Sequence, residues 1–150
     1  MQRSLNKGKI RIRRANLTDI RFLFNIHNQN IENGFFFSKK KINYSDHKIW
    51  FAKNISKTLI FICIKKTKIG YIRYDKFNRF DYKVSIAIKN TLKKKGLGKL
   101  LLKNTLKKIN SDKFKVYAFV KNSNFVSKSF FLDCNFKKFK QNGYVLKFQK

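Results

Sequence analysis

The 150 residues of this chain have the length of one ordinary domain. Hydrophobic residues make up 43% of them, enough to bury a core, which excludes a generally disordered protein. Lysine and arginine total 37 against 7 acidic residues, so the formal net charge is +30, and we expect no membrane span because no apolar run approaches the roughly 18 residues that one needs.

The predicted elements of the first half follow from apolar spacing and from turn residues. In chain order we expect a strand at residues 9–13, a helix at 20–27, an Asn-rich loop at 28–41, a helix that begins near residue 45, and strands at 58–64, 69–75 and 82–88. Short polar turns join the three consecutive strands, which favours antiparallel pairing.

In the second half the apolar period changes from that of a strand to that of a helix. In chain order we expect a leucine-rich helix at residues 97–109, a strand at 114–120, a helix at 124–134, and a hairpin of strands 136–139 and 144–148 around Asn142 and Gly143. This order predicts an α/β sandwich with a mixed, mostly antiparallel sheet of about seven strands and about four helices. We expect one domain over residues 1–150, with 1–8 as a loose N-terminus.

The N-terminal residues, the two cysteines and the two histidines favour a cytoplasmic protein without a metal site. No apolar stretch follows the first eight residues, so we expect no signal peptide. Cys63 and Cys134 lie far apart in apolar surroundings, which indicates two buried free thiols rather than a disulfide. Together with His27 and His47 they show no ligand spacing, and we expect no metal site.

The positive charge favours an anionic partner without identifying it. Lysine, asparagine, isoleucine and phenylalanine dominate and proline is absent, as an AT-rich genome would produce, and the lysines are spread along the whole chain. Codon bias is therefore an alternative explanation of the charge, and we do not expect nucleic acid to be the primary partner. The positive electrostatic field of the chain would also attract an anionic small molecule.

A basic, glycine-containing turn opens the leucine-rich helix. It consists of Lys93, Lys94, Lys95, Gly96, Leu97, Gly98 and Lys99. The glycines leave backbone N–H groups uncovered at the positive end of the helix dipole, which favours an anion such as a pyrophosphate. The spacing fits neither a P-loop nor a dinucleotide fingerprint. A solvated lysine-rich turn is the simpler alternative.

The order of this turn and a later segment resembles the GNAT N-acetyltransferase superfamily. Its pyrophosphate motif, Gln/Arg-x-x-Gly-x-Gly/Ala, is similar to residues 93–98, with Lys93 in first position. Its later signature, Asn-x-x-Ser/Ala-x-x-Leu-Tyr-x-x-x-Gly-Phe, is similar to residues 124–136, with Phe131 in place of Tyr and Asn135 in place of Gly. The likeness extends over nearly the whole chain.

This resemblance implies acetyl-CoA as co-substrate and direct transfer of its acetyl group to an amine. The implied cofactor-binding residues are Ser85, Ile86, Ile88, Lys93, Lys94, Lys95, Gly96, Leu97, Gly98, Lys99, Asn124, Ser127 and Phe131. His47 and Ser85 are the candidate catalytic residues. Asn124 can also be read simply as a helix N-cap, and His47 as a structural histidine.

Two further segments resemble GNAT enzymes that acetylate a UDP- or dTDP-linked amino-deoxysugar in nonulosonic-acid pathways. They are residues 42–51, with His47 and Trp50, and residues 69–75, with Arg73. The resemblance implies an anionic amino-sugar nucleotide as acceptor, and we take Trp50, Arg73 and Lys83 as candidate substrate-binding residues. Trp50 and Phe51 can equally be core residues.

Departures from the family pattern leave other functions open. Phe131 cannot protonate a departing thiolate as the usual Tyr does, and Lys83 stands where relatives often carry a carboxylate. These changes would also fit an acetyl-CoA-binding protein without turnover. A GNAT enzyme for another amine, such as a protein N-terminus, and a basic nucleic-acid-binding protein are the remaining alternatives.

Overall fold

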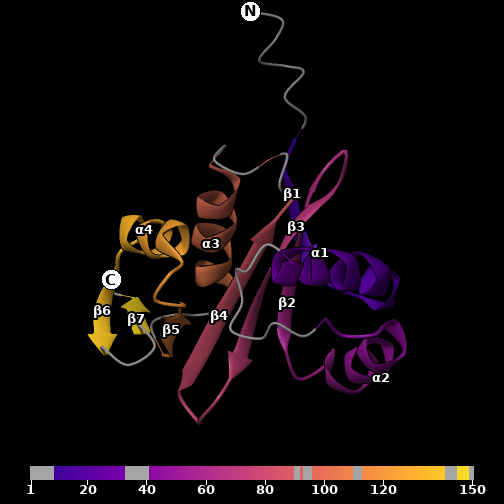
Figure 1. Ribbon diagram of the computed structural model, residues 1–150, viewed down its shortest axis with the longest axis horizontal. Coiled ribbons are helices and arrows are strands. Elements are labelled where there is room, and N and C mark those ends of the chain that lie inside the picture. Colours follow the sequence, from indigo (N-terminus) through magenta and orange to yellow (C-terminus); the bar gives the residue numbers. More distant parts are fainter. Residues whose placement is uncertain are drawn as a thin grey trace, which may run out of the picture.

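The computed structural model describes residues 9–32, 41–89, 92, 96–109, 113–140 and 145–148, and its centre is a seven-stranded sheet (Figure 1). The strands lie in the order β1-β2-β3-β4-β5-β7-β6. Their bounds are Arg11–Arg14 (β1), Leu59–Lys65 (β2), Thr67–Lys76 (β3), Asp81–Ile88 (β4), Lys115–Phe119 (β5), Phe136–Lys140 (β6) and Val145–Phe148 (β7). Only the β4–β5 pair is parallel, and the other neighbours are antiparallel.

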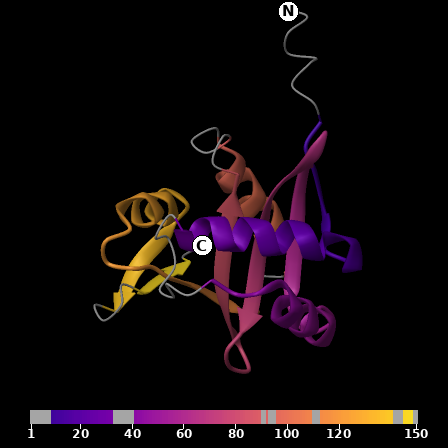
Figure 2. The same ribbon diagram turned by 45° about the vertical axis from the view of Figure 1, so that its right-hand side comes forward.

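Helices cover both faces of this sheet (Figures 1 and 2). They are α1 (Ile20–Glu32), α2 (Tyr44–Asn54), α3 (Leu97–Lys108) and α4 (Phe125–Asp133), and a 3-10 turn, η2 (Leu17–Asp19), leads into α1. One core cluster packs Leu101 and Leu102 of α3 against Ile72 of β3. The second packs Leu23 of α1 and Phe51 of α2 against the opposite side of the sheet. The two faces follow from the alternation of side chains along each strand.

The predicted fold class and the order of the elements are confirmed. Alternation of apolar residues predicts the strands well, and α3 buries Leu97, Leu101, Leu102, Thr105 and Leu106, which is the spacing of one helix face. The three consecutive strands pair antiparallel as expected. Asn142 and Gly143, on which the terminal hairpin was predicted, lie outside the described residues.

Two element boundaries differ from the prediction. Helix α1 continues to Glu32, so the first five residues of the predicted loop are helical, because asparagine lowers helix propensity only weakly. Helix α2 begins at Tyr44 rather than near Ser45, since Asn43 is the N-cap and its side chain accepts from the Asp46 N–H. Of the two thiols predicted to be free and buried, Cys63 is buried but Cys134 is only half-buried.

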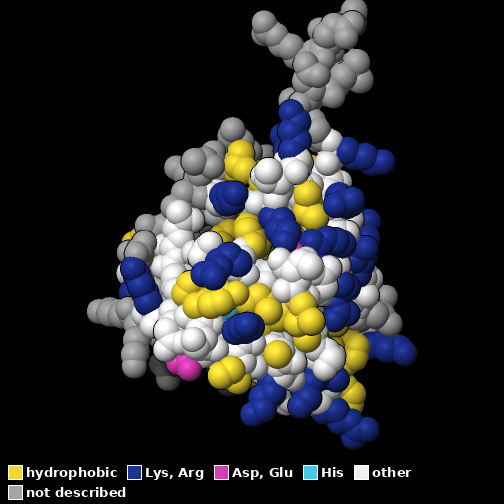
Figure 3. All heavy atoms as spheres, turned by 90° about the vertical axis from the view of Figure 1, so that its right-hand side faces the viewer, with side chains coloured by type: hydrophobic (Ala, Val, Ile, Leu, Met, Phe, Trp, Pro, Cys, Tyr) yellow, Lys and Arg dark blue, Asp and Glu magenta, His cyan; other side chains and the backbone are white. Residues whose placement is uncertain are grey.

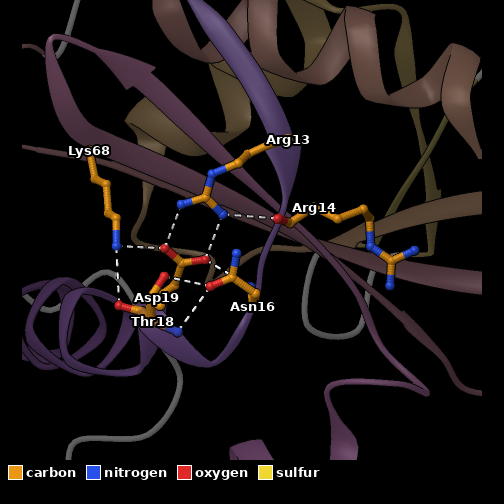
Figure 4. A network of polar contacts seen from close by, with 6 residues as sticks. All are labelled: Arg13, Arg14, Asn16, Thr18, Asp19 and Lys68. Carbon is orange, nitrogen blue, oxygen red and sulfur yellow. Dashed lines mark hydrogen bonds and ion pairs between the residues drawn. The ribbon is translucent and has the colours of Figure 1, made fainter.

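A buried carboxylate connects β1, η2 and β3 (Figure 4). Asp19 is fully buried and accepts two hydrogen bonds from the Arg13 guanidinium, at 2.8 and 2.9 Å. The Lys68 ammonium lies 2.6 Å away, and the Asn16 backbone N–H donates at 2.8 Å. These partners overcome the cost of burial and hold the pKa of Asp19 at about 2. The network fixes the point at which α1 begins.

No helix among the described residues is long and apolar enough to cross a membrane. The same part of the chain contains no group of three or more His, Cys, Asp or Glu side chains arranged to hold a metal ion.

Candidate active site

Strands β4 and β5 diverge after a short parallel ladder and form a fork. Their paired residues run from Asp81 with Lys115 to Lys83 with Tyr117 and then stop. Strand β4 continues to Ile88, where it still pairs with Gly70 of β3. Within the described residues, Val84 to Ile88 therefore have no strand partner on the β5 side. Backbone groups on this edge can pair with an extended ligand, as an added strand would.

A cavity of about 390 Å³ lies in this fork, and we name it the fork cavity. Its lining residues include Ser85, Ile86, Ile88, Gly96, Leu97, Gly98, Lys99, Asn124, Ser127 and Phe131. Every cofactor-binding residue that the sequence predicts and the structure describes therefore lines this one cavity. Lys93, Lys94 and Lys95 lie outside the described residues. Apolar residues that sequence reasoning missed, among them Phe119, Val120 and Phe130, complete the lining.

The N-terminus of α3 forms one end of the fork cavity. Gly96 is its N-cap with a φ of 78°, a left-handed conformation that suits glycine, and no side chain of the described residues caps the first turn. At Gly98 an added Cβ would lie 3.1 Å from the Phe130 ring, so a side chain there would fill the space against α4. The uncapped amides of this turn therefore face an open space with the positive end of the helix dipole.

Helix α4 supplies the opposite wall. The Asn124 side chain accepts from the Ser127 N–H, so the N-cap interpretation of Asn124 holds while the residue also lines the cavity. Phe131 is 5% exposed and packs edge-on against Phe130 and Phe136. Asn135 follows Cys134, the C-cap of α4, and its φ of 68° explains how asparagine can stand where the family pattern has glycine.

A second cavity, of about 430 Å³, lies on the other side of the sheet, and we name it the histidine cavity. Helices α1 and α2 and strands β2 and β3 provide its walls, with His27, His47, Trp50, Tyr71 and Arg73 among the lining residues. The Arg73 guanidinium lies 4.7 Å above the Trp50 ring and donates to Asp75 over 2.7 Å. A cation held on an aromatic ring beside an open space favours a polar or anionic ligand.

Both histidines of this cavity are neutral near pH 7. Burial, with Arg73 and His47 nearby, lowers the pKa of His27 to about 4. Burial also lowers the pKa of His47, although a hydrogen bond with the Ile20 backbone opposes the shift. The Nε2 atom of His47 is buried and has no hydrogen-bond partner among the described residues. Such an atom has a free lone pair that a ligand in the cavity can use.

The two cavities meet at one row of the sheet. Arg73, in the histidine cavity, pairs across the β3–β4 ladder with Ser85, which lines the fork cavity. The predicted residues His47, Trp50 and Arg73 are thus brought together, and Ser85 lies next to them.

Lys83 lines neither cavity, and its Nζ lies 5.8 Å from the Phe119 ring. Phe51 is completely buried, as a core residue, although it also borders the histidine cavity. Sequence reasoning considered His27 only as a metal ligand and missed its place in the histidine cavity.

Solved structures show the same fold at low sequence identity. A phosphinothricin acetyltransferase from Sinorhizobium meliloti in complex with acetyl-CoA matches with a TM-score of 0.79 and 16% identity, covering 92% of this chain and 86% of that one. A ribosomal-protein-alanine N-acetyltransferase from Brucella melitensis gives 0.75 and 18%, covering 91% and 94%. A spermidine N-acetyltransferase chimera from Vibrio cholerae gives 0.75 and 19%, covering 93% of each chain.

No curated protein sequence matches this chain significantly. The family model described as the acetyltransferase (GNAT) family does match, over residues 23–136. That match includes the fork, the uncapped N-terminus of α3 and the start of α4, which are the parts that the sequence resemblance implied. With most of its length matched, the chain belongs to the GNAT family and is an N-acetyltransferase that takes its acetyl group from acetyl-CoA.

Proposed function

We propose that the chain transfers the acetyl group directly to a primary amine on a nucleotide-linked amino-deoxysugar. One observation carries this choice of acceptor. The two segments that resemble the amino-sugar enzymes, residues 42–51 and 69–75, come from different elements, yet side chains of both line the histidine cavity. Segments that merely shared composition with those enzymes would not be expected to meet around one space.

The fork cavity fits acetyl-CoA by the shape and chemistry of its walls. The unpaired edge of β4 from Val84 to Ile88 would bind the pantetheine arm as a short extra strand. The amides of Leu97, Gly98 and Lys99 would bind the pyrophosphate, because they are uncapped and Gly98 has no side chain to block them. Apolar side chains around the fork exclude water from the arm.

Acetyl-CoA supplies an activated acyl thioester, and the residues of this chain supply position and polarity. The β4 backbone N–H near Ile86 is the candidate donor to the thioester oxygen, where negative charge develops. Ser85 stands at the junction of the two cavities, so an amine in the histidine cavity would reach the thioester there. In the transfer an N–C bond forms, the C–S bond breaks, and the thiolate leaves.

His47 is the candidate base for this transfer. Burial favours the neutral ring, and Nε2 has no partner in the part of the chain that the structure describes, so we propose that it accepts the proton that the attacking amine loses. Phe131, on the fork cavity, has no proton to give to the departing thiolate. We therefore propose that water protonates the thiolate.

Charge supports an anionic acceptor. The face covered by α1 and α2 displays many lysines and arginines and few acidic side chains (Figure 3). A protein of net charge +30 attracts a nucleotide diphosphate and repels a polycation such as spermidine. Added salt should therefore weaken productive binding of the acceptor and raise its KM. A KM that falls with added salt would indicate a cationic acceptor instead.

The proposal is tested by measuring CoA release with UDP- and dTDP-linked amino-deoxysugars, spermidine and an alanine-terminated peptide as acceptors. We expect turnover with an amino-sugar nucleotide and a loss of kcat in His47→Gln, while Lys48→Gln on the exposed side of α2 serves as the matched control. Turnover with spermidine or the peptide alone would contradict the proposed acceptor. Acetyl-CoA binding without CoA release for any amine would favour the non-catalytic alternative.

A further inference from the structure

Three aromatic side chains form a partly exposed cluster beside the fork, and we name it the aromatic shelf. It consists of Phe77, at the end of β3, with Tyr117 and Phe119 of β5. The Phe77 ring centroid lies 5.7 Å from that of Tyr117 and 5.7 Å from that of Phe119, both edge to face. Phe77 is 48% exposed and Phe119 is 43% exposed. Neither ring is needed to fill a core, so the shelf calls for another explanation.

The shelf faces the same side of the sheet as the histidine cavity. Tyr71 of β3 packs in the core beneath α1 and α2, and side chains on a strand alternate, so Arg73 points to that side as well. Phe77, one residue after the end of β3, is placed by its ring contacts with Tyr117 and Phe119. On β5, Val116 and Ala118 pack in the opposite core, beneath α3 and α4. The alternating Tyr117 and Phe119 therefore point to the histidine-cavity side.

The shelf is also continuous with the donor site. Phe119 lines the fork cavity while its ring contacts Phe77. Along β3, Phe77 lies four residues beyond Arg73, the partner of Ser85, and a strand advances about 3.3 Å per residue, which places the shelf up to about 13 Å from the transfer point. A ligand whose amine lies at Ser85 can therefore reach the shelf with its other end.

The charges around the shelf suit a ring that carries phosphate. Lys83 lies over the Phe119 ring at 5.8 Å, on the strand between Ser85 and the shelf. Two acidic residues neighbour Lys83 in the ladder: its cross-strand partner Asp75, which accepts from Arg73, and Asp81, which accepts from Asn78. A lysine thus stands between the transfer point and the rings, where its ammonium can meet a phosphate.

We propose that the aromatic shelf binds the planar base of the acceptor nucleotide, with Lys83 beside its diphosphate. Aromatic rings stack on any nucleobase because every base has a π-face, and an adjacent cation strengthens such a site. This assignment rests on the proposed function for the acceptor being a nucleotide-linked sugar. It gives Lys83 and the shelf a role that neither cavity accounts for.

Phe77 is the decisive residue, because it belongs to the shelf but does not line the fork cavity. We would titrate the wild type, Phe77→Ala and Phe80→Ala with UDP, with inorganic pyrophosphate and with acetyl-CoA by calorimetry. Phe80 is the matched control, since it is 56% exposed in the same hairpin but is not part of the shelf. Thermal unfolding of each variant shows that it is folded, and sedimentation velocity gives its oligomeric state.

The expected result is that Phe77→Ala weakens UDP binding about tenfold, as the loss of one stacked ring should. Its pyrophosphate and acetyl-CoA affinities, and all affinities of Phe80→Ala, should match the wild type. Equal UDP affinity in Phe77→Ala and the wild type overturns the assignment, even where an amino-sugar nucleotide is acetylated. A dimer that dissociates on Phe77→Ala, with UDP binding unchanged, makes the shelf an interface between two copies and also overturns it. Acetyl-CoA binding without any UDP binding to the wild type refutes the nucleotide-linked acceptor itself.

Discussion

Gly98 offers a direct perturbation of the donor site. A Cβ added at this position would lie 3.1 and 3.3 Å from two carbons of the Phe130 ring and 3.8 Å from Cδ1 of Ile86. Alanine therefore requires the Phe130 ring to move by a few tenths of an ångström. Glutamate adds a larger side chain and a negative charge, both next to the uncapped amides that would bind the pyrophosphate.

The two substitutions should weaken acetyl-CoA binding to different extents, because alanine adds only steric overlap whereas glutamate also adds charge repulsion. Overpacking of a well-filled site costs about 1 kcal/mol at the lower end, so Gly98→Ala should weaken acetyl-CoA binding by less than about tenfold. A glutamate carboxylate about 5 Å from a phosphate adds about 1 to 3 kcal/mol of repulsion, depending on the local dielectric constant. Gly98→Glu should therefore weaken binding by about 30-fold or more.

Calorimetric titration with acetyl-CoA measures both effects. Lys103→Gln is the matched control, because it lowers the net charge by one unit, as Gly98→Glu does, from an exposed position on α3 that does not line the fork cavity. Thermal unfolding shows whether each variant is folded. If Gly98→Glu binds acetyl-CoA as tightly as the wild type, or no more weakly than Lys103→Gln, the donor does not use this turn and the reasoning is refuted.

Three further predictions concern the buried charge, the histidine and the missing phenol. Asp19→Asn should lower the free energy of unfolding by about 3 kcal/mol, because Arg13 and Lys68 lose their buried partner. As a control, Asp46→Asn at an exposed position of α2 should lower it by less than about 1 kcal/mol. Equal urea midpoints for the two variants would contradict this prediction. His27 is protonated near pH 6.5 in the unfolded chain but only near pH 4 in the native chain, so the free energy of unfolding should fall as the pH drops through this window. The full pKa shift corresponds to about 3 kcal/mol, and we expect about 1.5 kcal/mol because the side chain is partly exposed. Urea unfolding at pH 7 and pH 5 should show a weaker pH dependence in His27→Gln, and an unchanged one would argue against the shift. Phe131→Tyr should raise kcat about tenfold at unchanged acetyl-CoA affinity by restoring a proton donor, and an unchanged kcat would show that thiolate protonation does not limit the rate.

Most of the fold could be predicted because its elements have strong, simple periods. The leucine spacing of residues 97–109 defines α3, and alternation defines the central strands. Helix boundaries were predicted less accurately where a single side chain determines them. Asn43 begins α2 because its side-chain oxygen accepts from the Asp46 N–H, and the neighbouring Ser45 and Asp46 are also residue types that cap helices.

The lining of the fork cavity could be predicted because most of it is local in the sequence. The glycine turn and the Asn124 segment each lie within a few residues, and the family pattern names them. The histidine cavity was predicted only in part, because it brings together side chains that are distant in the chain, such as His27 and Arg73. Phe119 and Phe77 gave no signal, since an aromatic residue at the end of a strand is ordinary until the register places two of them together.

The central claim is that the fork binds acetyl-CoA specifically rather than attracting any polyanion through a charge of +30. The most direct test is calorimetric titration of the purified protein with acetyl-CoA, ATP and a short DNA duplex at moderate salt. We predict micromolar binding of acetyl-CoA and much weaker binding of ATP and DNA. Equal affinity for all three would contradict the account, because the glycine turn would then be only a basic loop.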